Sequence, residues 1–146
     1  MAYGGLGDTT LPRQTKFMPG SPPLASEKIC AFAAATDPER AKAFYRDRLG
    51  LHLVREELPF ALVFDVNGIM LRVQMVRELK PPGFTVLGWN VSDIEAAVRR
   101  LEQAGVKMER FDRVPQNELG IWTAPNGAQV AWFKDPDGNI LSIAQH

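Results

Sequence analysis

Short apolar runs and two amphipathic segments alternate along the chain in an order that occurs twice. In the first occurrence, residues 29–35 form an apolar run of strand length. Asp37-Pro38 then suits a helix start, Gly50 suits its end, and the apolar residues between them recur at helical spacing. Three further strand-like runs follow, at 51–56, 60–65 and 69–76. The pattern predicts a β-α-β-β-β unit in which Asn67-Gly68 makes a two-residue hairpin turn.

The second occurrence begins after Lys80-Pro81-Pro82-Gly83, a stretch typical of a linker. Residues 84–91 favour a strand, and 93–105 favour a helix capped by Asp93 and ended by Gly105. Further strands are predicted at 106–111, 130–134 and 139–144, and residues 121–123 are a candidate short extra strand. Residues 112–120 have no counterpart in the first unit, so we interpret them as an inserted loop.

Matching residues support a true internal repeat. Three pairs lie 70 positions apart: Asp65 and Asp135, Gly68 and Gly138, and Leu71 and Leu141. A repeat of this kind outweighs any single motif as evidence of architecture. We therefore predict an α+β fold of two tandem βαβββ modules, whose curled mixed sheets surround a central cavity. The expected organisation is a flexible N-terminal arm (1–28), a first module (29–79), a linker (80–83) and a second module (84–146).

Composition and charge restrict the classes of partner. Lys plus Arg and Asp plus Glu both number 17 and are interspersed, so neither nucleic acid nor a membrane surface is an expected partner. Cys30 is the only cysteine, which excludes an internal disulfide and fits a reducing compartment. We find no apolar run of membrane-spanning length and no signal peptide, and therefore expect a cytoplasmic protein.

Three segments carry a family resemblance. They are residues 37–51 (DPERAKAFYRDRLGL), 91–106 (VSDIEAAVRRLEQAGV) and 133–143 (FKDPDGNILSI). Because these three segments occur together, the chain resembles the vicinal oxygen chelate superfamily over about residues 28–145. That group includes glyoxalase I, bleomycin-resistance proteins, fosfomycin-resistance enzymes and extradiol dioxygenases. The resemblance implies paired βαβββ modules around a cavity and, for chains this short, a homodimer.

The resemblance also implies where metal ligands of such proteins would lie. Carried onto this sequence, the positions are Cys30 and Val86 on the first strand of each module, and Arg72 and Ser142 on the last. Val86 has no donor atom, and Arg72 is a permanent cation that repels a divalent metal. One thiolate and one neutral hydroxyl do not make a metal site. We therefore expect neither a metal nor another cofactor.

Alternation along the strands suggests which side chains face the cavity. If Leu71 and Val73 pack on the helix, then Met70, Arg72 and Gln74 point into the cavity. Arg72 is a candidate anchor for an anionic ligand group, and the alternative is an Arg paired with an internal acid or exposed at an edge. The other ligand-binding candidates are Phe32, Trp89, Trp132 and Ser142. Trp132 is favoured for the cavity because Ala131 and Phe133 suit a helix-facing surface, although core packing is expected for several aromatics.

Candidates for catalysis are weaker. Cys30 is a possible nucleophile but shows no partner base, and a small buried residue is the alternative. His52 is a candidate acid or base, and Glu118, beside Asn117 in the inserted loop, is a candidate base or lid residue; surface positions are the alternatives.

These observations favour a metal-independent protein that binds a small aromatic or amphiphilic molecule, as in bleomycin-type sequestration. The alternative is a glyoxalase-like lyase or isomerase, or a dioxygenase, with non-standard site residues. A scaffold whose cavity is filled by its own side chains is the third possibility.

Overall fold

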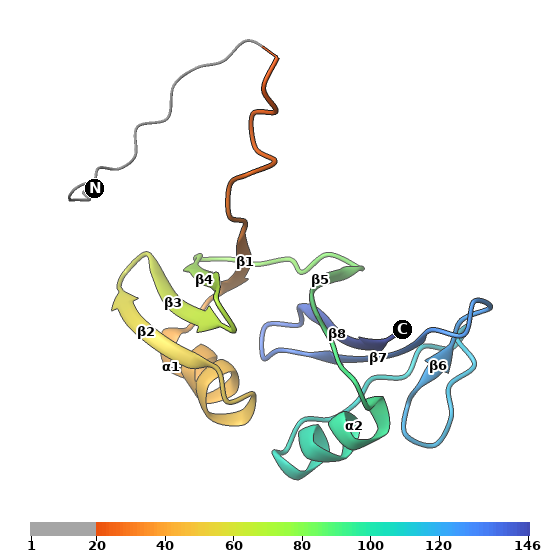
Figure 1. Cartoon of the computed structure of the whole chain (residues 1–146). Coiled ribbons are helices and arrows are strands. Elements are labelled where there is room, and N and C mark those ends of the chain that lie inside the picture. Colours follow the sequence, from red (N-terminus) through yellow and green to blue (C-terminus); the bar gives the residue numbers. More distant parts are fainter. Residues whose placement is uncertain (1–19) are drawn as a thin grey trace.

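Two four-stranded mixed sheets form the body of the protein, which we describe from a computed structural model for residues 20–146 (Figure 1). The first sheet has the order β1-β4-β3-β2, with β1 at Cys30–Ala35, β2 at His52–Glu57, β3 at Ala61–Val66 and β4 at Ile69–Met75. The second has the order β5-β8-β7-β6, with β5 at Thr85–Asn90, β6 at Trp122–Thr123, β7 at Gln129–Lys134 and β8 at Ile140–Gln145. The predicted α+β class and repeated strand arrangement are confirmed.

Each module contributes one helical segment. In the first, α1 (Pro38–Lys42) continues into the π-helical η1 (Ala43–Arg48), and Asp37 caps α1 by accepting bonds from the backbone N–H groups of Glu39 and Arg40. In the second, α2 (Ile94–Gln103) is capped by Asp93, which accepts a bond from the N–H of Ala96. The cap residues thus fix both helix starts as the sequence predicted.

The β3–β4 hairpin turns at Asn67-Gly68, as predicted. Asn67 has a φ of 49° and Gly68 a φ of 89°, and the carboxylate of Asp65 accepts a bond from the N–H of Gly68. Positive φ at both central residues matches the right-handed twist of the flanking strands. This turn fixes the β3–β4 register that sets the direction of every side chain on β4.

The two sheets each have a helix-covered face and an open face. In the first sheet, Leu71 and Val73 are almost fully buried on the helix-covered face, whereas Phe32 and Arg72, paired across β1 and β4, lie on the open face. In the second sheet, Phe133 and Leu141 are buried and paired on the helix-covered face. The open faces of the two sheets therefore carry the alternate positions of each strand.

A single apolar cluster joins the helix-covered faces of both modules. The ring of Phe44 on η1 lies 6.4 Å from that of Phe133 on β7. Beside it, the hydroxyl of Tyr45 donates to Asp135 at 2.6 Å, and the side-chain amide of Asn139 donates to the carbonyl of Ala34 at 2.8 Å. The β7–β8 turn of the second module is thus bonded directly to the first module.

The predicted strand at 106–111 is wrong. In that segment Met108 forms only an isolated bridge with Phe133, and the fourth strand of the second sheet is β6, in the segment predicted as a short extra strand. The physical reason lies in the inserted loop, where the amide of Gln116 bonds to the backbone of Phe111, Glu109 and Gly120. These bonds occupy backbone groups that a continuous strand would use for pairing.

The predicted division into an N-terminal arm, two modules and a linker stays a prediction. Most of the predicted arm (1–28) lies outside the described residues, and residues 20–28 are exposed and hold no helix or strand. The described residues border several cavities, with volumes from about 200 to about 430 Å³. Within residues 20–146, no helix is long and apolar enough to cross a membrane.

Candidate functional site

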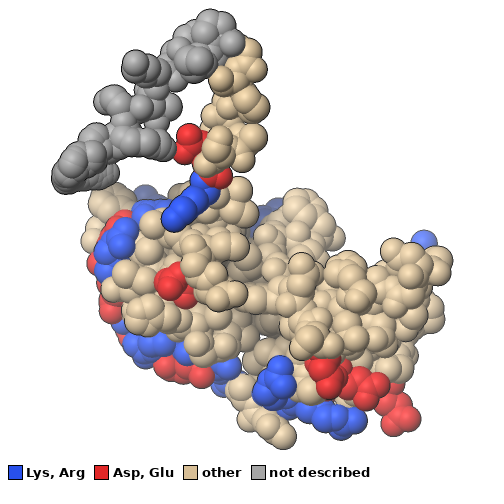
Figure 2. Space-filling view, viewed as in Figure 1, with Lys and Arg blue, Asp and Glu red and all other residues tan. Residues whose placement is uncertain are grey.

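The open face of the first sheet gathers four of the predicted ligand-binding residues. Phe32 on β1 pairs with Arg72 on β4, and Met70 and Gln74 flank Arg72 on the same face. Phe32 is 50% exposed and Met70 39% exposed, so this apolar surface is open to solvent in a single chain. In Figure 2 the middle of the visible surface, where β1, β4 and β5 lie in Figure 1, carries few charges. Charged side chains gather instead at its left and lower margins.

Arg72 is paired with an acid from its own sheet. Its guanidinium lies 3.0 Å from Glu57, which also accepts a bond from Arg55. Bonds from Arg55 and then Arg72 hold the pKa of the Glu57 carboxyl below its usual range. The Arg72 side chain is 26% exposed, so the group is partly open to a ligand. Of the alternatives weighed from the sequence, the structure shows the internal pair.

The open face of the second sheet carries an aromatic cluster centred on Trp132. Trp132 pairs across the strands with Ser142, opposite in direction to the buried Ala131 and Phe133. Its ring lies 6.2 Å from that of Trp122 and 5.6 Å from that of Phe111, the latter nearly perpendicular at 86°. We call Phe111, Trp122 and Trp132 the aromatic cluster. It combines β6, β7 and the residue that directly precedes the inserted loop.

A shallow cavity of about 260 Å³ adjoins this cluster. It is lined by residues of the linker, of β5, β7 and β8, and of the segments directly before β5 and before the inserted loop: Gly83, Phe84, Thr85, Phe111, Trp132 and Ile140. Phe84 is 67% exposed. The neighbouring Gly88 lacks a side chain where an added Cβ would lie 2.8 Å from the hydroxyl of Ser142. The glycine therefore keeps this part of the open face flat.

Trp89 lies apart from the other candidates. It projects from the helix-covered face of β5, where its ring stacks on Phe133 at 6.3 Å. There it lines the boundary between the two modules instead of the open face that holds Trp132. Its neighbours Leu87 and Ile143 share this direction.

The three catalytic candidates are not brought together. Cys30 is half-buried at the start of β1, and its thiol contacts the carbonyl of Ala31 at 3.7 Å. His52 is exposed at the start of β2, opposite Asp65. Glu118 is exposed in the inserted loop, where its backbone carbonyl accepts a bond from Arg110. The neighbouring Asn117 has a structural role, since its side chain accepts bonds from the N–H groups of Leu119 and Ile121.

The positions that the resemblance assigns to metal ligands do not fit a divalent metal. Arg72 brings a positive charge and is paired with Glu57, and Val86 lies in an irregularity of the β5–β8 pairing without a donor atom. Within residues 20–146 no three His, Cys, Asp or Glu residues are grouped as metal ligands would be. No step through a metal is therefore derived for this site.

Sequence reasoning did not assign Glu57, Phe111 and Trp122 to the open faces. Glu57 could have been found from alternation along β2, but the register shift between Leu53 and Arg55 moves the alternation by one residue. Phe111 lies in the segment wrongly predicted as a strand, so its direction was not predictable. Trp122 lies in the candidate short strand at 121–123, and its direction is defined by the pairing of that strand with β7 at Val130.

Comparison with known proteins identifies the fold and the family. The model of the Glyoxalase/Bleomycin resistance protein/Dioxygenase superfamily matches residues 30–143. A putative glyoxalase family protein from Bacillus anthracis superposes with a TM-score of 0.65 at 14% identity, covering 91% of this chain and 99% of that one. Lactoylglutathione lyase from Agrobacterium tumefaciens gives a TM-score of 0.61 at 21% identity, covering 83% and 95%. A search of curated proteins gave no match. The chain therefore belongs to the Glyoxalase/Bleomycin resistance protein/Dioxygenase superfamily.

Proposed function

We propose that this protein binds a small aromatic or amphiphilic molecule at the aromatic cluster, without a divalent metal, and acts by sequestration. The observation that carries the proposal is the position of Trp132, half-buried on the open face of the second sheet and bordering a cavity of about 260 Å³. Aromatic side chains that border a cavity offer a large contact area and stacking geometry to a flat ligand.

Metal independence is supported by the donor chemistry of the described residues. A divalent metal takes thiolate, imidazole or carboxylate ligands at close range. The four family positions offer one thiol, one hydroxyl, one aliphatic side chain and one guanidinium, and the guanidinium already faces Glu57. The Arg72 side chain instead suits an anionic group of a ligand, which would compete with Glu57 for it.

A homodimer is part of the proposal. The open face of the first sheet exposes Phe32 and Met70, and the second exposes Phe84 beside the aromatic cluster. A second copy that laid one open face over the other would cover these apolar side chains. It would also bring Arg72 of one chain toward Trp132 of its partner and enclose the ligand.

The alternative is a glyoxalase-like lyase or isomerase, or a dioxygenase, that uses non-standard residues. Cys30, His52 or Glu118 would then supply the reacting group of a metal-free isomerase, or a metal with relocated ligands would act in a lyase or dioxygenase. Metal content of the purified protein separates metal-independent binding from the metal-dependent form of this alternative. We expect Zn²⁺, Ni²⁺, Mn²⁺ and Fe²⁺ far below one per chain, and a stoichiometric ion bound among the four family positions would contradict metal-independent binding.

The binding proposal is tested by tryptophan fluorescence titration with bleomycin and a panel of single-ring and two-ring aromatics. We expect quenching by at least one compound and a loss of affinity of about fivefold or more in Trp132→Ala, since an aromatic contact contributes about 1 kcal/mol beyond its area. Trp89→Phe is the matched control because Trp89 lies on the other face of the same sheet. Equal loss in both variants, or no loss in Trp132→Ala with the fold intact, would contradict the assignment of the site.

A further inference from the structure

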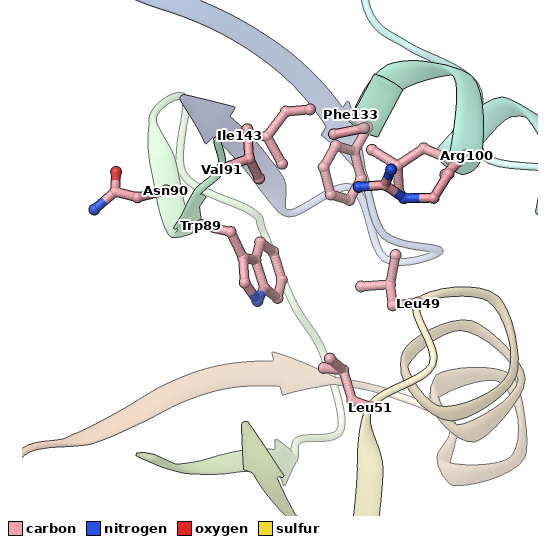
Figure 3. Close-up of a pocket in the computed structure, with 10 residues that line it drawn as sticks. Leu49, Leu51, Trp89, Asn90, Val91, Arg100, Phe133 and Ile143 are labelled. Carbon is pink, nitrogen blue, oxygen red and sulfur yellow. The ribbon is translucent and has the colours of Figure 1, made fainter. Parts of the chain in front are cut away.

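A second cavity lies between the two modules, on the helix-covered side of both sheets. It has a volume of about 200 Å³ and is lined by Leu49 and Leu51 of the first module and by Trp89, Leu101 and Phe133 of the second (Figure 3). Its walls are mainly apolar side chains, and the space suits a single ring or a short alkyl chain. It shares no lining residue with the cavity at the aromatic cluster.

One charged side chain, that of Arg100, lines this apolar cavity and is itself exposed. Figure 3 shows Arg100 reaching from α2 with its guanidinium beside Phe133 and above Leu49. Among residues 20–146, Arg100 makes no ion pair and donates no side-chain hydrogen bond, and it lies in the last turn of α2. A guanidinium next to apolar walls gains most from an acceptor that carries a full negative charge.

The indole N–H group of Trp89, on the opposite wall, also lacks a hydrogen-bond partner among residues 20–146. The indole ring of Trp89 points toward the first module, with its nitrogen on that side of the ring (Figure 3). Within the described part of the chain, this half-buried N–H group donates no hydrogen bond to a protein acceptor. Trp89 is half-buried and Arg100 is exposed, so both donors are accessible to a ligand that enters from solvent.

We propose that this inter-module cavity binds a small amphipathic monocarboxylate, with one ring or a short alkyl chain, whose carboxylate pairs with Arg100. The apolar part lies against the stacked rings of Trp89 and Phe133 and against Leu49 and Leu51. Because these residues come from both modules, an occupied cavity holds the modules together. The site is separate from the ligand site proposed on the open face, and neither depends on the other.

The test uses the full chain and phenylacetate as the probe, with phenylacetamide as its neutral counterpart. Binding is followed by isothermal titration calorimetry and by tryptophan fluorescence. We expect phenylacetate to bind, phenylacetamide to bind at least tenfold more weakly, and Arg100→Ala to weaken phenylacetate at least tenfold. These ratios follow from the loss of a charge-assisted hydrogen bond.

Arg99→Ala is the matched control, because Arg99 is exposed on the same helix, does not line the cavity, and its loss changes the net charge equally. We expect it to change phenylacetate affinity less than twofold, and we expect the same of Trp132→Ala. Absence of binding up to millimolar phenylacetate would overturn the proposal. So would equal weakening by Arg99→Ala and Arg100→Ala, which indicates nonspecific charge attraction, or loss of binding in Trp132→Ala, which places the probe on the open face.

Discussion

The carboxylate of Asp135 accepts four hydrogen bonds, and one of them crosses between the modules. The donors are the hydroxyl of Tyr45, the N–H group of Asp137, and the N–H and side-chain amide of Asn139. The sequence predicted the turn, because Asp-Pro-Asp-Gly has clear turn chemistry. It did not predict the bond from Tyr45, which lies 90 residues away in the helical segment of the first module. Local patterns fix turns and caps, whereas such long-range polar pairs follow from tertiary packing.

At this residue we predict that Tyr45→Phe lowers the free energy of unfolding by about 1.5–3 kcal/mol. The reason is that a buried carboxylate loses one of its donors while the ring packing against Phe44 and Phe64 is kept. Urea denaturation followed by circular dichroism measures the change. Tyr3→Phe is the matched substitution at the other tyrosine, and an equal effect of both variants would contradict a specific role for the Tyr45–Asp135 bond.

The same tyrosine gives a pH prediction with a defined sign. Burial, and then the negative charge of Asp135, raise the pKa of Tyr45 above its ordinary value. Above about pH 10 the unfolded chain releases this proton while the folded chain retains it, so the contribution to stability falls as pH rises further. We expect the free energy of unfolding to fall less steeply between about pH 10 and 11 in Tyr45→Phe than in the wild type. If the free energy of unfolding fell equally steeply with pH in both proteins, the raised pKa of Tyr45 would be contradicted.

At the scale of elements, the first module and its hairpin were predictable, and the inserted loop was not. Caps at Asp37 and Asp93 and the turn at Asn67-Gly68 act within a few residues, so their sequences specify them. In the inserted loop, by contrast, side-chain amides replace regular pairing. An apolar run such as 106–111 satisfies a strand pattern equally well whether or not its backbone groups are already bonded to Gln116.

We predict that Gln116→Ala disorders the inserted loop and weakens the aromatic cluster. The substitution leaves the backbone groups of Glu109, Phe111 and Gly120 without their partner, which should cost about 1–3 kcal/mol of stability. It should also change the near-ultraviolet circular dichroism of Trp132 and Trp122. Glu118→Ala in the same loop is the control, because that side chain is exposed. A spectral change of similar size in Glu118→Ala would contradict a specific role for the bonds from Gln116.

At the scale of the whole molecule, the repeat in the sequence predicted the two modules with their sheets, and the resemblance of three segments predicted the family. The sequence did not predict how the two modules contact each other. Their shared apolar cluster and the bonds from Tyr45 and Asn139 join the helix-covered faces, so both open faces remain available. Alternation predicted directions for Met70 and Trp132, whereas it assigned no residue to the boundary between the modules that Trp89 and Arg100 line.

This arrangement leads to the prediction of a homodimer formed through the open faces. An exposed apolar surface beside a sheet is commonly covered by a partner. Phe32 is 50% exposed at the middle of this surface. In light scattering at micromolar concentration we expect twice the 16.2 kDa mass of one chain.

Phe32→Lys should shift the equilibrium to the monomer, because it places a charge in the apolar contact without removing a core side chain. Glu102→Lys, which adds a lysine on the exposed side of α2, should leave the dimer intact. A monomeric wild type would refute the dimer, and a Phe32→Lys dimer of unchanged affinity would move the interface away from the first sheet.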